Sequence, residues 1–155
     1  MENQKTVLEL QPLLREWASS RNLLNAEIAP KQKLKLFEEL GEVSKAILNT
    51  DVQEQKDGIG DGFVVLSILA MQIGDFDSLF DGYAKIREQT ELLLLDVLDN
   101  AVRYNSVANA MASLQIIALK LGYDFQECAN IAWNEIKDQK GKTVGGTFIK
   151  ESVKM

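Results

Sequence analysis

The segment Lys35-Leu36-Phe37-Glu38-Glu39-Leu40-Gly41-Glu42-Val43 predicts an amphipathic helix with one acidic edge. At about 100° per residue, Glu38, Glu39 and Glu42 fall within an arc of roughly 100°. The apolar side chains of the same segment occupy the opposite arc, which is typical of a helix that covers a core. The sequence therefore places three carboxylates along one edge of a helix that packs onto the rest of the protein.

A second acidic pair, Asp57 and Asp61, lies one helical turn apart and begins a stripe that enters residues 63–73 (FVVLSILAMQI). A segment that is apolar almost all round is buried on most sides, so acids that extend its stripe are expected to point inward. Two like charges at about 4 Å repel by about 4 kcal/mol at an effective dielectric of about 20. Converging carboxylates from both segments would therefore take up protons or hold a cation.

The donor types available favour a hard divalent ion. The sequence has no His and one Cys, which leaves no ordinary zinc or thiolate site. Carboxylate oxygens favour Mg²⁺, with Mn²⁺ as a substitute. The alternative interpretation is a solvated acidic helix face. Gly58, Gly60 and Gly62 argue against it, because glycines cost helix stability and so indicate a close approach by a neighbouring helix or a ligand.

Length and composition predict a single globular domain over residues 1–155. The hydrophobic content of 46% and charged content of 26% are ordinary for such a domain. A net charge of −6 argues against a nucleic-acid or anionic-membrane partner. No apolar run is long enough to span a bilayer, and residues 1–6 are polar with no signal-peptide core after them. We expect a cytoplasmic protein in which Cys128 is a small buried side chain in a reducing compartment.

The periodicity predicts an all-α helical bundle with a short C-terminal β-hairpin. Pro30 suits the first turn of a helix, and Gly74 and Gly122 are typical of helix C-termini. Residues 141–150 are expected to form the hairpin, turning at Gly145-Gly146. The helices are expected at about residues 5–22, 30–49, 52–74, 80–104, 106–121 and 124–138.

An internal echo suggests that a helix pair is duplicated. Residues 66–74 (LSILAMQIG) are similar to residues 114–122 (LQIIALKLG). Asp96 and Asp99, on a Leu-rich segment, correspond to Glu39 and Glu42 of the first acidic helix, and Asn109 corresponds to Asp61. The echo predicts a pseudo-symmetric four-helix core with a second, partial acidic site. Chance similarity between Leu-rich helices that end in Gly is the alternative.

Several motifs together carry a resemblance to a known family. They are Trp17-x-x-x-Arg21, Gln32-x-x-Lys35-Leu36-x-x-Glu39-x-Gly41-Glu42, Asp57-Gly-Ile-Gly-Asp61-x-x-Val-Val65-Leu66, Glu127-Cys128, Trp133-Asn-Glu-Ile-Lys137-Asp-x-Lys140-Gly-Lys142 and Gly146-Thr-Phe-Ile-Lys150. They resemble the all-α nucleoside triphosphate pyrophosphohydrolases, and especially the small MazG-like proteins often carried by phages. The resemblance covers most of the chain except about residues 76–110.

This resemblance implies an enzyme that cleaves a nucleoside or deoxynucleoside triphosphate between the α and β phosphates, giving the monophosphate and pyrophosphate. It implies Glu39, Glu42 and Asp61 as Mg²⁺ ligands and Glu38 as the carboxylate that orients or deprotonates the attacking water. The family usually has a Glu three residues before the last of these ligands, where this chain has Gly58. Asp57 is expected to replace it.

Basic and aromatic residues are expected to bind the substrate. Lys35 lies in the acidic arc and either contacts phosphate or pairs with Glu39. A basic cluster precedes the tail and either clamps the triphosphate or only complements a helix C-terminus. Trp17, which shares a helix face with Arg21, either stacks on the base or is a core residue. The basic cluster consists of Lys137, Lys140 and Lys142.

Two further hypotheses concern function and assembly. A catalytically inactive helical interaction or regulatory module is the alternative to an enzyme, and Gly58 in the ligand position favours it. A redox dimetal bundle would use Glu-x-x-His pairs, which a chain without histidine does not have. Helix pairs of this kind bury their remaining apolar faces against a second subunit, so we expect a homodimer or homotetramer.

Overall fold

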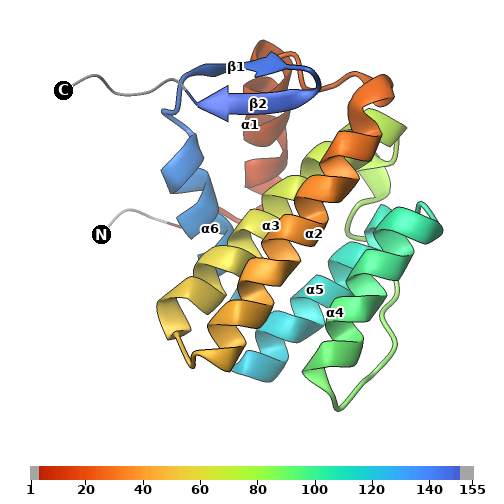
Figure 1. The fold of residues 1–155 in the computed structure, drawn as a ribbon, viewed down its shortest axis with the longest axis vertical. Helices are drawn as coiled ribbons and strands as arrows, with labels where there is room; N and C mark the ends of the chain where they lie inside the picture. The colour runs from red at the N-terminus through yellow and green to blue at the C-terminus, as the bar shows by residue number, and fades with distance from the viewer. Residues whose placement is uncertain (1–3, 151–155) are drawn as a thin grey trace.

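A computed structural model describes residues 4–150, which form a helical bundle with a C-terminal hairpin (Figure 1). Short helical turns lie at Ala26–Ile28, Phe76–Ser78 and Asp99–Arg103. None of the helices in residues 4–150 is both long and apolar enough to cross a membrane. The main elements are α1 (Val7–Ser20), α2 (Ala29–Leu48), α3 (Val52–Ile73), α4 (Thr90–Leu98), α5 (Val107–Leu121), α6 (Phe125–Ile136), β1 (Gly141–Val144) and β2 (Thr147–Lys150).

Local capping signals set the helix boundaries. Thr6 and Glu9 form a capping box at the start of α1, each side chain bonding the other residue's backbone N–H at 3.0–3.1 Å. Pro30 lies in the first turn of α2, as predicted. Gly74 and Gly122 end α3 and α5 in the left-handed conformation, with φ of 85° and 86°. The predicted helix ends are confirmed at these positions.

Helix α3 is the central element, and α1, α2, α5 and α6 all pack against it (Figure 1). Its segment Phe63–Ala70 is buried at every position, which confirms the burial expected for residues 63–73 over most of that length. The carboxylate of Asp61 precedes this segment by half a turn. Asp61 therefore lies on the helix that contacts most of the other helices.

Three glycines let neighbouring helices approach α3 closely. A Cβ on Gly58 would lie 2.6 Å from a methyl group of Val43 in α2, and one on Gly62 would lie 3.2 Å from Leu114 in α5. A Cβ on Gly60 would collide with the backbone carbonyl of Cys128 in α6. The sequence left a helix or a ligand open as the cause, and the close contacts are helix packing. Cys128 itself is fully buried, as expected, and burial raises the pKa of its thiol to about 11.

Helices α2 and α3 form one pair, α4 and α5 form a second, and α3 packs against α5. The second helix of each pair ends with the same backbone contact. After α3 the N–H of Asp75 donates to Ala70 O, and after α5 the N–H of Tyr123 donates to Ala118 O, both at 2.8 Å. This arrangement agrees with the predicted four-helix core. Whether the pairs arose by duplication stays a hypothesis.

The helix predicted over residues 80–104 is wrong in its first half. Residues 81–89 are non-helical, and α4 begins only at Thr90. Gly82 lies against the backbone of Ala108 in α5, where a Cβ would have no room. The N–H of Tyr83 donates to Asn109 Oδ1 at 2.8 Å, so its backbone is bonded to α5 and not within a helix.

The C-terminal hairpin forms as predicted. Strands β1 and β2 are antiparallel, with Val144 opposite Thr147 and Lys142 opposite Ile149. Gly145 and Gly146 make the turn with φ of 56° and 83°. Consecutive positive φ values are typical of the tight turn that Gly-Gly favours.

Gly60→Ala tests the contact between α3 and α6. Because the new methyl group would meet backbone and not a flexible side chain, we expect a loss of about 1–3 kcal/mol or more in the free energy of unfolding, measured by urea denaturation. Gly41→Ala is the matched control. Gly41 is an exposed helical glycine with nothing within 4 Å of its Cβ position, so the same change should stabilise by about 0.5–1 kcal/mol. Equal effects at the two sites would contradict this packing.

Candidate functional site

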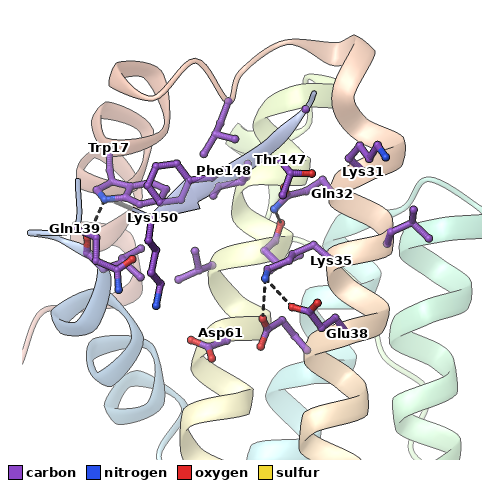
Figure 2. Close-up of a pocket in the computed structure, with 18 of the residues that line it drawn as sticks. Trp17, Lys31, Gln32, Lys35, Glu38, Asp61, Gln139, Thr147, Phe148 and Lys150 are labelled. Carbon is purple, nitrogen blue, oxygen red and sulfur yellow. Dashed lines mark hydrogen bonds and ion pairs between the residues drawn. The ribbon is translucent and has the colours of Figure 1, made fainter. Parts of the chain in front are cut away.

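A pocket of about 500 Å³ opens between α2, α3, α6 and the hairpin. Its volume is within the range of small-molecule sites in proteins. Its lining includes the apolar side chains of Val64, Val65 and Ile68 of α3 and charged side chains from α2, α3, α6 and the hairpin. Gln32 of α2 connects the two helices beneath it, because its amide donates to Val65 O at 3.1 Å (Figure 2).

Glu39 of α2 and Asp61 of α3 lie together in this pocket. The side chain of Glu39 is only 13% exposed, and its carboxylate is near enough to that of Asp61 for its charge to act on it. Burial, followed by the charge of Glu39 and then that of Glu135, raises the pKa of Asp61 to about 7. Burial also raises the pKa of Glu39, although Lys35 opposes the shift. These two acids from neighbouring helices meet in a sheltered place, as the sequence predicted.

Lys35 bridges the acids of its own helix. Its Nζ lies 2.6 Å from Glu38 Oε1 and 3.6 Å from Glu39 Oε1 (Figure 2). Lys35 therefore pairs with Glu39, as one interpretation had it, and also lines the pocket; its contact with a phosphate stays a prediction. Glu38 is exposed at the rim of the same pocket.

The other two predicted ligands lie outside the pocket lining. Glu42 is exposed on α2, one turn beyond Glu39. Asp57 is half-buried, and its Oδ1 accepts a hydrogen bond from Gln53 at 2.9 Å. It is still near enough to raise the pKa of Asp61 and of Glu135. Within residues 4–150, no three acidic, His or Cys side chains are grouped so that they could hold a metal ion, and the predicted ligand set stays a prediction.

Trp17 forms part of the pocket wall and is also a core residue, with 7% exposure. Its indole N–H donates to Ile136 O at 2.9 Å, and its ring meets Phe148 edge-on at 5.2 Å. Arg21 stacks on the same indole at 4.3 Å and donates to the carbonyls of Trp17 and Gln139. It lies outside the pocket lining and joins α1 to the chain that leads into the hairpin.

The predicted lysine cluster lies outside the pocket. Lys137, Lys140 and Lys142 are all exposed, and none of them lines it. Lys31 and Lys150 line it instead. The alternation of the strand accounts for the difference: Lys142 pairs with Ile149 on one face of the hairpin, whereas Lys150 shares the other face with Phe148.

Sequence reasoning also missed Glu135, whose pKa is raised by burial and then by Asp57. Glu135 lies at the end of α6, within the motif whose lysines were predicted to bind the substrate. The packing of α6 on α3 is what brings it near Asp61. Period-2 spacing places Phe148 and Lys150 on one face of the hairpin, but only the packing of the hairpin decides that this face meets the pocket.

The acids of the second helix pair are neutralised within their own region. Asp96 accepts two hydrogen bonds from Arg87 at 3.1 and 3.3 Å, and Asp99 lies 3.6 Å from Arg103. Asn109, the counterpart of Asp61, accepts from the backbone of Tyr83. The suggested second site thus consists of ion pairs and a backbone contact.

Comparison with known proteins adds one finding. No family model matches the chain, and no solved structure matches it. A stretch of 67 residues is 42% identical to an uncharacterized 18.2 kDa protein in the rep-hol intergenic region of Haemophilus phage HP1 (strain HP1c1). The chain therefore has a phage-encoded relative. The match spans 41% of each protein, so the chain covers less than half the length of that relative.

The pKa of Asp61 predicts how metal-free stability depends on pH. Because the pKa is about 7 in the folded protein against 3.8 ordinarily, the folded state holds a proton between these values that the unfolded chain has released. The free energy of unfolding should therefore fall as the pH rises through this window, and the shift of Glu39 acts in the same direction.

Melting temperatures measured in EDTA from about pH 5 to about pH 8 test this. Asp61→Asn should remove most of the slope, whereas Asp77→Asn, at an exposed position outside the pocket, should keep it. A slope that survives in Asp61→Asn would show that this carboxylate is not its source.

Proposed function

We propose that the protein is a Mg²⁺-dependent nucleoside triphosphate pyrophosphohydrolase of the all-α, MazG-like type. The single observation that supports it best is the pairing of Glu39 with Asp61 in a pocket of about 500 Å³. Two carboxylates that repel one another at a site with a raised pKa are stabilised by a proton or by a cation. Their oxygens suit Mg²⁺, and an ion there would neutralise the charge of phosphate oxygens and lower the pKa of a bound water.

The residues of the chain have separate tasks in this proposal. Glu39 and Asp61 would hold the ion, with Glu42 and Asp57 as further acids of the same two helices. Glu38, at the rim and held by Lys35 at 2.6 Å, would orient the attacking water and accept its proton. Phosphoryl transfer asks a protein mainly for positioning and charge neutralisation, which a pocket with both acids and lysines can supply.

The apolar wall of the pocket would take the nucleoside. Val65, Ile68, Trp17 and Phe148 line the pocket and offer an apolar surface of the kind on which a base packs. Water is thereby kept from one side of the substrate while the charged side receives the phosphates. A lining that combines apolar side chains with a few charged groups is typical of small-molecule sites.

One observation favours the alternative of an inactive interaction or regulatory module. Gly58 stands where the family has a ligand, and its Cα faces Val43 of α2 with no room for a side chain. The chain therefore needs another acid in that role, and without one the pocket would bind without catalysing.

Hydrolysis assays separate the two functions. Ribo- and deoxynucleoside triphosphates are incubated with and without Mg²⁺, and pyrophosphate is separated from orthophosphate. Glu39→Gln and Asp61→Asn should each lower Mg²⁺-dependent pyrophosphate release by about 100-fold or more, because each removes charge that is needed in the transition state. Glu91→Gln, at an exposed position on α4, is the control. Absence of turnover with every nucleotide would favour the inactive module.

We infer that a second copy of the chain covers the outer face of α2. Leu34, Phe37 and Leu48 lie along one stripe of this helix with exposures of 61%, 48% and 84%. Exposed apolar stripes of this kind are typical of subunit interfaces. Light scattering should give the mass of a dimer or tetramer for the wild type and a lower mass for Phe37→Glu. A monomeric wild type would contradict the inference.

A further inference from the structure

The hairpin runs from the end of α6 to the beginning of α2 (Figure 1). Its root follows α6, and its tip rests on the far side, where the Cβ position of Gly146 is 3.0 Å from Ile28 and 3.2 Å from Lys31. Gly146, Thr147, Phe148 and Lys150 all line the pocket. The hairpin therefore closes one side of the cavity and is supported at both ends.

Helix α1 holds the middle of the hairpin. The Thr143 hydroxyl donates to Arg21 O at 2.5 Å, and the ring of Phe148 packs edge-on against Trp17. The Arg21 guanidinium donates to Gln139 O just before β1. These contacts use groups far apart in sequence and fix the hairpin relative to the pocket, not merely relative to α6.

Lys150 is the cation that this arrangement directs into the site. It shares a strand face with Phe148, and its side chain extends from β2 toward the side of the pocket that holds Asp61 (Figure 2). Lys35 is already paired with Glu38 and Glu39, whereas Lys150 makes no ion pair within 4 Å in the described part of the chain. Its charge acts on Glu135, whose pKa it lowers against the effect of burial. An ammonium group that lines the same pocket as Glu39 and Asp61 suits a ligand that carries negative charge and is bridged to the acids by a cation.

We propose that the hairpin Gly141–Lys150 is a substrate-binding strap. Lys150 contacts the phosphates of the nucleotide, and the seating of Gly146 on Ile28 keeps that lysine over the pocket. The identity of the ligand rests on the proposed function. The strap makes Lys150, and not the lysine cluster before β1, the phosphate-binding residue of the C-terminal region.

Binding of inorganic triphosphate in the presence of Mg²⁺, measured by calorimetry, tests the role of Lys150 without a base or a reaction. Lys150→Met should weaken binding by about 10- to 100-fold, as expected for loss of a hydrogen bond to a charged group. Lys142→Met is the matched control, since this lysine is exposed on the opposite face of the same hairpin. Equal affinities for Lys150→Met and the wild type would overturn the proposal.

Asparagine substitutions at the turn test the seating. Asn tolerates positive φ, so Gly145→Asn, with nothing within 4 Å of its Cβ position, should leave triphosphate binding unchanged. Gly146→Asn meets Ile28 and should lift the tip, weakening binding about as much as Lys150→Met does. The double variant Gly146→Asn/Lys150→Met should bind triphosphate no more weakly than either single variant. Both changes remove the same contact, that of Lys150 with phosphate, so their effects should not add. Wild-type affinity in Gly146→Asn would overturn the seating.

The outcomes for the strap and for the enzyme are separable. Pyrophosphate release by the wild type, together with unchanged triphosphate affinity in Lys150→Met, would refute the strap and leave the hydrolase standing. Triphosphate binding that depends on Lys150, in a protein that hydrolyses no nucleotide, would support the strap and refute the hydrolase. A wild type that binds no triphosphate refutes the strap.

Discussion

The close approach of α3 to its neighbours is the constraint on which the candidate site depends. Gly58 and Gly60 admit Val43 of α2 and the carbonyl of Cys128 in α6 to distances that no side chain would allow. Asp61 follows within one turn, so its carboxylate is enclosed by the same two helices. This enclosure brings it against Glu39 and lifts its pKa to about 7. Packing and electrostatics are thus one feature of the molecule: without the tight helix contacts, the two acids would be separate and hydrated.

The pocket combines a helical part with a two-stranded cover. Its floor is made by α2 and α3, which Gln32 joins through a buried hydrogen bond, and its wall is apolar core. Its cover is a two-stranded hairpin, which at this size depends on its contacts with α1 and α2 for stability. Trp17 belongs to both parts because it packs in the core and against Phe148.

The sequence predicted the elements whose signals are local. Pro30, Gly74, Gly122 and the Gly-Gly turn fixed boundaries that the structure confirms. The helix expected from residue 80 failed because a contact with α5 at Gly82, distant in sequence, replaced local propensity. Among site residues, Glu39 and Asp61 followed from helical spacing on adjacent segments. Lys150 and Glu135 were missed because their place depends on how the hairpin and α6 pack, which no spacing within either segment specifies.

The contrast between the two helix pairs has an evolutionary consequence. In the pair α2 and α3, Glu39 and Asp61 lie close together at a cost in stability. In the pair α4 and α5, Asp96 is neutralised by Arg87. Selection for stability alone would favour a similar basic partner beside Asp61, and on the proposed function selection for the site would remove it. The second pair is under no such conflict, so its sequence is free to drift wherever packing and charge balance are kept. Among homologues, variation should therefore concentrate in the half that carries Arg87.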